Sequence, residues 1–215
     1  GGAVHGSNLT ARNCTFTNNS ASHYGGAVRS VNCLFDYCVF TSNSANYGGG
    51  ISTGGYFTLL GCVFKNNSAD NDGGGIFHRR NNSVSELLIL RCVFINNSAG
   101  KDGGGMLAIP EELIISQSRF SSNSAGRDGG AFYAQQQSKI FNTVITNNSA
   151  DNDGGGCHFS YGNSKITNSV ITNNSAGNDA GGIYSYAKST ITNCVITNNS
   201  ARNDGGGIFQ GYAEH

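Results

Sequence analysis

Residues 146–156, Thr-Asn-Asn-Ser-Ala-Asp-Asn-Asp-Gly-Gly-Gly, contain the pattern that decides the fold. A glycine-rich triplet followed by an apolar residue recurs at intervals of 23 to 30 residues, and Asn-Ser-Ala precedes each triplet after the first. A regular period of this length indicates one supersecondary unit stacked on copies of itself. Each unit of such a stack contacts only its neighbours, so we expect residues 1–215 to form a single repeat domain. The triplets begin at Gly1, Gly25, Gly48, Gly73, Gly103, Gly129, Gly154, Ala180 and Gly205.

Each copy contains three short β-branched segments separated by turn residues, and no stretch has helical periodicity. Alignment of the copies gives three apolar columns, which predict three strands per coil and a three-sided interior. A single coil cannot bury its own core, whereas about eight coils can. The sequence therefore predicts an all-β parallel β-helix of about eight coils of roughly 25 residues. The columns are Phe16, Phe40, Phe64, Phe94, Phe120, Ile145, Ile171 and Ile196; Ala11, Phe35, Leu59, Ile89, Ile115, Ile140, Ile166 and Ile191; and Val4, Val28, Ile51, Ile76, Met106, Phe132, Cys157, Ile183 and Ile208.

Five of the seven cysteines share one position of the repeat, and an odd number leaves at least one thiol unpaired within the chain. Ser118, Thr143 and Ser169 take that position in the other copies, which favours a column of small inward-facing residues. Disulfides between adjacent coils are the alternative, because stacked strands lie about 4.8 Å apart. No CxxC spacing indicates a zinc site. The five are Cys14, Cys38, Cys62, Cys92 and Cys194, and the oxidation state of the first four stays open.

The corner asparagines predict a hydrogen-bonded ladder along the axis, because identical side chains recur at the spacing of stacked strands. The ladder would contain Asn19, Asn43, Asn67, Asn97, Asn123, Asn148, Asn174 and Asn199. Acidic residues also recur before the glycines, and each usually accepts hydrogen bonds from its own turn. Asp70 with Asp72, and Asp151 with Asp153, are weak calcium candidates. We otherwise expect neither a metal nor a cofactor.

Composition limits the possible partners. Charged residues make up 12% of the chain and the net charge is zero, so no basic surface is available for nucleic acid. No apolar run is long enough to cross a bilayer, so we expect no membrane insertion of this segment. The chain does not begin with Met, and it begins and ends at the same phase of the repeat. We therefore expect a piece of a longer chain or of an assembly.

The residues that follow the apolar column after the glycines form a candidate interaction face. If that apolar column points inward, the next residue of each strand points outward. Rings beside a strip of glycines suit the stacking of sugars or the packing of a second rod. The alternative is a column covered by loops of the chain itself. The face consists of Phe77, Leu107, Tyr133, His158, Tyr184 and Phe209, with His5 and Arg29 at the equivalent positions of the first coils.

Two motifs recur together: Phe-x-x-Asn, as in Phe16 to Asn19 and Phe64 to Asn67, and Gly-Gly-Ala-apolar, as in Gly25 to Val28. This pair resembles the repeat of the chlamydial polymorphic membrane proteins, and the resemblance covers the entire chain. Ile stands where the first motif has Phe in the last three copies. The resemblance implies a right-handed parallel β-helix that is displayed outside the cell as an adhesin passenger.

Three other readings stay open. Val-x-Thr repeats such as Val144 to Thr146 suggest an ice-binding face, although Lys65, Ile95 and Arg119 interrupt it. Parallel β-helices also include polysaccharide-active lyases and hydrolases, but fold alone does not imply that activity and no unique acidic cluster is evident. Asn-x-Ser/Thr motifs predict N-glycosylation if the chain is secreted by a eukaryote. The candidate sites are Asn18, Asn66, Asn81, Asn96, Asn147, Asn173 and Asn198.

These observations favour an extracellular or cell-surface protein with a structural or adhesive role and no catalytic residues. The expected partners are glycans or proteins of a cell surface, or a second copy of the chain. No polar cap is evident at Gly1 or after Phe209, and unpaired terminal strands can pair with another chain. We therefore expect either more chain at both ends or stacking of copies, head to tail or laterally, into a filament.

Overall fold

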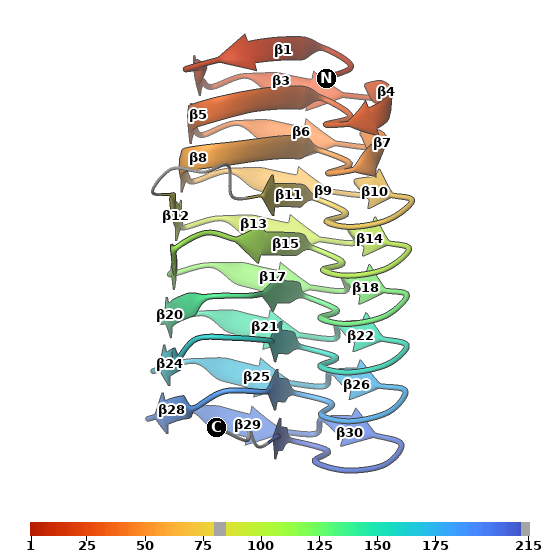
Figure 1. Cartoon of the computed structure of the whole chain (residues 1–215), viewed down its shortest axis with the longest axis vertical. Coiled ribbons are helices and arrows are strands. Elements are labelled where there is room, and N and C mark those ends of the chain that lie inside the picture. The colour runs from red at the N-terminus through yellow and green to blue at the C-terminus, as the bar shows by residue number, and fades with distance from the viewer. Residues whose placement is uncertain (80–84, 212–215) are drawn as a thin grey trace.

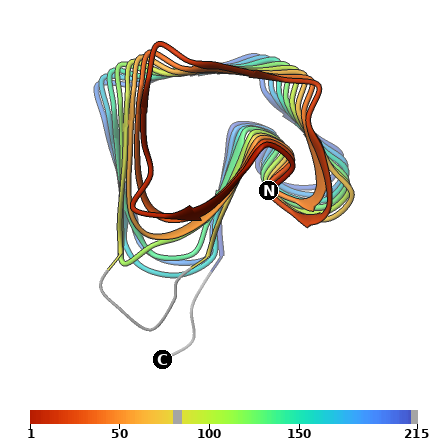
Figure 2. The same ribbon diagram turned by 90° about the horizontal axis from the view of Figure 1, so that it is seen from above.

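The chain forms a parallel β-helix in which every strand pairs with its equivalent one coil further on (Figure 1). The structure is a computed structural model that describes residues 1–79 and 85–211. All strand pairs are parallel, and they form one 15-stranded sheet and two 8-stranded sheets. Viewed along the axis, the coils superpose closely, and the outline bends inward at the glycine-rich segment where the N-terminus lies (Figure 2). The all-β fold and the coil number are as predicted.

The 15-stranded sheet contains two of the three expected strands of each coil. β5 and β8 run through both positions and join the two halves of this sheet. Its first row, which follows the glycines, is β1 (Val4–Ser7), β5 (Val28–Asp36), β8 (Ile51–Leu60), β11 (Ile76–Arg79), β15 (Met106–Ile109), β19 (Phe132–Ala134), β23 (Cys157–Phe159), β27 (Ile183–Ser185) and β31 (Ile208–Gln210). Its second row is completed by β2 (Thr10–Arg12), β12 (Glu86–Leu90), β16 (Glu112–Ser116), β20 (Gln137–Phe141), β24 (Ser164–Thr167) and β28 (Ser189–Thr192).

The second sheet is formed by the third strand that we expected in each coil. The third sheet was not predicted from the sequence pattern. Its core is the Ser-Ala pair that follows each ladder asparagine. The second sheet contains β3 (Thr15–Thr17), β6 (Val39–Thr41), β9 (Val63–Lys65), β13 (Val93–Ile95), β17 (Arg119–Ser121), β21 (Val144–Thr146), β25 (Val170–Thr172) and β29 (Val195–Thr197). The Ser-Ala sheet contains β4 (Ser20–Tyr24), β7 (Ser44–Tyr47), β10 (Ser68–Ala69), β14 (Ser98–Ala99), β18 (Ser124–Ala125), β22 (Ser149–Ala150), β26 (Ser175–Ala176) and β30 (Ser200–Ala201).

Three corners per coil turn the chain through the left-handed region of backbone conformation. Asn193 and Asn198 have φ angles of 51° and 55°, and Gly154 has 67°. Asparagine and glycine adopt these angles more readily than other residues, which accounts for their recurrence. The glycine after each corner is required for a second reason. A Cβ on Gly155 would lie 2.2 Å from the carbonyl oxygen of Ser175, so a side chain has no room between the coils.

The three apolar columns fill the interior, as predicted. Ile51, Phe94 and Ile115 are fully buried, and so are their equivalents in the central coils. The alanine of each Ser-Ala pair adds a further buried column, for example Ala99 and Ala125. Within the described part of the chain no helix is long and apolar enough to span a membrane.

The corner asparagines form a continuous ladder beside this core. Each Nδ2 donates to the Oδ1 of the next asparagine over 2.9–3.0 Å, from Asn19 through to Asn199. The same Oδ1 also accepts the backbone N–H of the preceding asparagine, as between Asn97 and Asn123. The six inner members are at most 1% exposed. The ladder therefore satisfies buried backbone groups that the corner would otherwise leave unpaired.

The cysteine column makes a second ladder that explains why Ser and Thr can replace Cys. Cys92 Sγ donates to the Leu90 carbonyl at 3.2 Å, and Ser118 Oγ donates to the Ser116 carbonyl at 2.8 Å. Cys92 Sγ also accepts the backbone N–H of Cys62 from the neighbouring coil, at 3.4 Å. All seven cysteines are free thiols in the structure.

Candidate functional site

The candidate interaction face is a single column of side chains on the outer side of the first row of strands. Strand register places Phe77 opposite Leu107, and then Tyr133, His158, Tyr184 and Phe209 in turn. From Tyr133 onward the rings stack on one another, with centroids 4.5–5.3 Å apart and planes within 20° of parallel. The coil spacing of a β-helix therefore brings these rings into the range of aromatic stacking.

The column is not equally exposed along its length. Phe77 and Leu107 are 7% and 4% exposed, and His158 is 8% exposed. Tyr47, the last residue of β7, covers Phe77 with ring centroids 5.1 Å apart, so at Phe77 the column is covered by another strand of the chain and not by a loop. In the later coils Tyr133, Tyr184 and Phe209 stay half-exposed.

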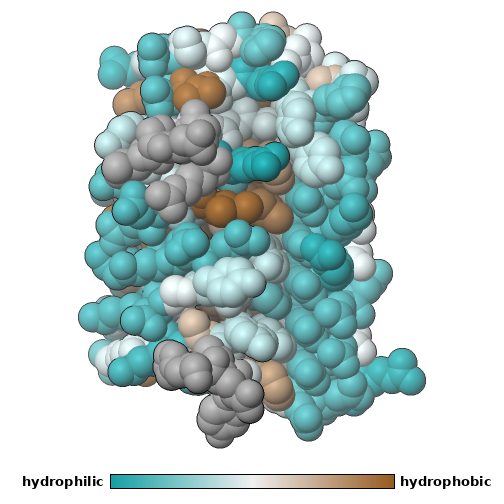
Figure 3. Space-filling model, viewed as in Figure 1, coloured by the Kyte–Doolittle hydropathy of each residue, from teal (hydrophilic) through white to brown (hydrophobic). Residues whose placement is uncertain are grey.

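Two further tyrosines, which the repeat pattern did not indicate, lie near the half-exposed part of the column. Tyr161 and Tyr186 are 61% and 47% exposed, and they follow β23 and β27 in the turns of the same two coils. Their sequence position could have indicated them, because each tyrosine stands in the turn directly after the strand that carries the ring column. The surrounding face is mostly hydrophilic, with small hydrophobic patches (Figure 3).

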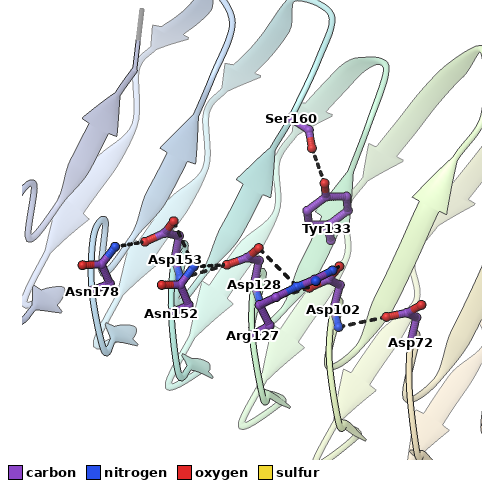
Figure 4. A network of polar contacts seen from close by, with 9 residues as sticks. All are labelled: Asp72, Asp102, Arg127, Asp128, Tyr133, Asn152, Asp153, Ser160 and Asn178. Carbon is purple, nitrogen blue, oxygen red and sulfur yellow. Dashed lines mark hydrogen bonds and ion pairs between the residues drawn. The ribbon is translucent and has the colours of Figure 1, made fainter.

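A row of aspartates runs across the coils next to the ring column (Figure 4). Each carboxylate accepts the backbone N–H of the aspartate one coil further on, over 3.0–3.3 Å. The row is thus a structural ladder like the asparagines, but one made of negative charges. Burial raises the pKa of Asp72 and of Asp128 above the ordinary carboxyl value. The members are Asp72, Asp102, Asp128, Asp153, Asp179 and Asp204.

Positive charge compensates only part of this row. Arg127 Nε donates to Asp102 Oδ1 at 2.7 Å and lies 3.7 Å from Asp128 Oδ2. One coil further on, the register position of Arg127 is occupied by Asn152, and then by Asn178. These amides donate to Asp128 and Asp153, at 2.9 and 2.8 Å, but carry no charge. Within residues 1–79 and 85–211, Asp153 has no ion pair.

His158 lies where the ring column meets the aspartate row. Its ring is sandwiched between Tyr133 and Tyr184, with centroid distances of 4.7 and 4.5 Å. Its buried Nδ1 has no hydrogen-bond partner. Burial lowers the pKa of His158 to about 4, so the imidazole is neutral near pH 7. One ring nitrogen and one carboxylate oxygen each from Asp128 and Asp153 lie within 4.8 Å of one another.

The calcium candidates of the sequence lie apart from this arrangement, except for Asp153. Asp70 and Asp151 are exposed, whereas Asp72 is a member of the aspartate row. Across the described residues, the one group of three metal-ligating side chains is Asp128, Asp153 and His158. The sequence spacing gave no indication of this group.

The remaining sequence candidates lie on other faces. The first asparagine of each Asn-Asn-Ser motif is an exposed left-handed corner residue, as at Asn66 and Asn173, and Asn81 lies outside the described residues. The Val-x-Thr strands stack in register, but Lys65 and Ile95 take the Thr position in two coils and Thr146 is only 6% exposed. Glu112 forms an ion pair with Lys139. The glycosylation candidates that lie at this exposed position are Asn18, Asn66, Asn96, Asn147, Asn173 and Asn198.

Comparison with known families identifies the repeat. The Chlamydia polymorphic membrane protein repeat matches residues 13–30, 61–79, 117–135, 142–160 and 193–210. Each matched segment begins at the corner before the cysteine position and ends within the strand that carries the ring column or one residue after it. Five segments of the chain therefore carry the Chlamydia polymorphic membrane protein repeat. No curated protein and no solved structure matched the chain.

The intervening coils of this polymorphic membrane protein-like chain follow the same register without a match of their own. The strands Val93–Ile95 and Ser98–Ala99 of the unmatched coil that contains Phe94 and Asn97 pair in register with the strands of the matched coils on both sides. In these strands the repeat keeps its register between the matched segments.

Proposed function

We propose that the chain is a cell-surface β-solenoid that adheres to glycans or proteins through the outer ring column of its later coils. The observation that carries this proposal is the stack of Tyr133, His158, Tyr184 and Phe209, whose tyrosine and phenylalanine members are half-exposed. Planar rings on a rigid surface bind flat partners with little loss of conformational entropy. The repeat family supports a surface role, since proteins with this repeat are named as membrane proteins.

A binding role also agrees with the chemistry of the surface. The aspartates next to the column accept backbone N–H groups of neighbouring coils, so they hold the coils together. The column provides aromatic area in a regular series instead. We therefore assign the chain no catalytic activity, and we place it outside the cell.

The experiment is a binding measurement with the double variant Tyr133→Ala/Tyr184→Ala. Fluorescently labelled protein is applied to a glycan array and to cultured epithelial cells. We expect the double variant to lose at least about tenfold in apparent affinity, because each aromatic anchor contributes about 1 kcal/mol or more when its face is covered. Circular dichroism checks that the variant retains the β-helix.

Tyr56→Ala is the matched control, because Tyr56 is 54% exposed and lies outside the ring column. If Tyr56→Ala reduces binding as much as the double variant does, the assignment of the face is contradicted. Absence of wild-type binding to both glycans and cells would contradict adhesion. Sedimentation over a range of concentrations tests the other expected partner, since a chain that pairs with itself associates without any added ligand.

A further inference from the structure

We propose that Asp128, Asp153 and His158 form a binding site for a divalent first-row transition cation such as Zn²⁺. Three potential ligand atoms, one from each side chain, lie within 4.8 Å of one another. The two carboxylates come from equivalent corners of adjacent coils, and the imidazole comes from the strand that follows Asp153. A cation held here would bridge the aspartate row and the ring column, a role that goes beyond adhesion.

The histidine provides the observation that a cluster of acids alone would not. His158 is 8% exposed, and its buried Nδ1 has no hydrogen-bond partner. A buried polar atom without a partner costs about 1–3 kcal/mol, so its retention needs a reason. The neutral imidazole is the form that binds a metal ion. Every other stacked ring of the outer column from Tyr133 onward is Tyr or Phe, and so only this coil places a nitrogen ligand beside the acids.

The surroundings fix the three ligands in place. Tyr133 and Tyr184 hold the imidazole plane between them, within 9° and 5° of parallel. Asn152 Nδ2 donates to Asp128 Oδ1 at 2.9 Å and to Asp153 Oδ2 at 3.1 Å, so one amide orients both carboxylates (Figure 4). Hydrogen bonds of this kind to ligating side chains orient them and tune metal affinity.

Charge also favours a cation at this place in the row. Arg127 contacts Asp102 and Asp128, whereas the amides that follow it in the register leave Asp153 without a positive partner among the described residues. Two carboxylates on adjacent coils repel each other when both are ionised. A divalent ion between them would remove that repulsion and would supply the charge that Arg127 provides one coil earlier.

The donor set selects the class of ion. Calcium and magnesium prefer oxygen ligands only, whereas imidazole with carboxylates suits zinc, nickel, cobalt and copper. Three protein ligands leave a fourth position of a tetrahedral ion open to water or to a ligand. Asp128 and Asp153 are half-buried, so an ion can reach them from solvent.

The test is calorimetric titration of the reduced, metal-free chain with ZnCl₂, repeated with CaCl₂. We expect one Zn²⁺ per chain, with a Zn²⁺ affinity at least about tenfold above that for Ca²⁺. His158→Phe retains a stacked ring, since Phe209 takes this position two coils further on, but removes the nitrogen ligand. We expect this variant to bind Zn²⁺ at least about tenfold more weakly, in line with the effect of losing even an outer-sphere partner. His158→Tyr, which places the residue of both neighbouring coils at this position, provides a second variant with a stacked ring if the first does not fold.

Asp179→Asn is the matched control, because Asp179 belongs to the same row but not to the group of three. We expect it to retain wild-type Zn²⁺ affinity, whereas Asp153→Asn loses it. The seven thiols are the competing ligands, and Co²⁺ substitution separates them because thiolate ligation adds a charge-transfer band that His and Asp do not give. The proposal is overturned if the wild type binds no Zn²⁺, if His158→Phe binds it equally well, or if Asp179→Asn weakens binding as much as Asp153→Asn.

Discussion

The chain stacks rings twice, once inside the β-helix and once outside it, and the two stacks occupy different halves of the molecule. The inner stack runs from Phe16 to Phe120, with centroids 4.5–4.8 Å apart and planes within 7° of parallel. The outer stack runs from Tyr133 to Phe209 at 4.5–5.3 Å. Coil spacing sets the geometry of both stacks. Burial distinguishes the two stacks, since the inner rings fill the core whereas Tyr133, Tyr184 and Phe209 stay half-exposed.

The end of the inner stack shows how the core keeps its volume. After Phe120 the column continues with isoleucine, beginning at Ile145. Phe132 and Phe159 then enter the core from the first row of strands. The ring centroid of Phe132 lies 5.3 Å from that of Phe120 and 5.8 Å from that of Phe159. The aromatic volume thus moves from one sheet to another, which keeps the interior close-packed while the sequence of the column changes.

Truncation inside the inner stack should have the largest effect on stability. Phe94 is fully buried and stacks on Phe64 and Phe120. We expect Phe94→Ala to lower the free energy of unfolding by about 3–5 kcal/mol, because it removes buried area and leaves a cavity between two rings. Tyr184→Ala in the outer stack should cost about 1 kcal/mol, since its ring is half-exposed. Urea titration of both variants measures the contrast, and equal losses would show that the two stacks do not differ in their contribution to stability.

Phe94→Ile sharpens the same comparison, because Ile145 and Ile171 already occupy this column. We expect a loss intermediate between the wild type and Phe94→Ala. In the later coils Phe132 and Phe159 supply the volume that isoleucine leaves unfilled in this column. Near Phe94, however, the strand position of Phe132 is occupied by the smaller Met106. A neutral Phe94→Ile variant would contradict this account of compensation.

The asparagine ladder keeps both stacks at their spacing, and its disruption should have the next largest effect. Asn97 Nδ2 donates to Asn123 Oδ1 and to the Phe64 carbonyl, and its Oδ1 accepts from Asn67. Asn97→Ala leaves buried partners without hydrogen bonds, at about 1–3 kcal/mol for each group, so we expect a loss of about 2–4 kcal/mol. Asn96 is the matched control, because it is an exposed corner residue at φ 54°, and Asn96→Gly should change stability by less than about 1 kcal/mol. Equal urea midpoints for Asn97→Ala and the wild type would exclude a stabilising ladder.

Repetition made the parts of the fold that recur predictable. The apolar columns and the corner asparagines could be aligned by eye, because each recurs in every coil at the pitch of a β-helix. The Ser-Ala sheet was missed because a strand of two small residues has neither length nor β-branching to indicate it. It is defined only by its neighbours.

The site was less predictable, because it depends on residues that do not recur. Tyr24 and Tyr47 cover Phe77 from irregular early coils, and no spacing rule connects them with that strand. The meeting of Asp128 with His158 depends on how the corner loop returns beside the strand of the next coil. That path is set by the close packing of glycine backbones between coils, as at Gly155. Sequence alone assigns these residues to columns. It does not show which columns lie beside one another.

The smallest expected effect concerns the cysteine column, which borders the inner stack. Cys92→Ser should change stability by less than about 1 kcal/mol, because Ser118 takes the same place one coil further on and makes the same bond to a carbonyl two residues earlier. Cys92→Val, whose side chain has the shape of Thr143 two coils further on, cannot donate to Leu90 or accept from the backbone N–H of Cys62. We expect it to cost about 1–3 kcal/mol, the penalty for a buried donor without a partner. Urea midpoints of the two variants, measured under reducing conditions, test this difference. If Val is tolerated as well as Ser, the column selects for side-chain size alone. The cysteine ladder would then contribute nothing to the coil spacing that both ring stacks share.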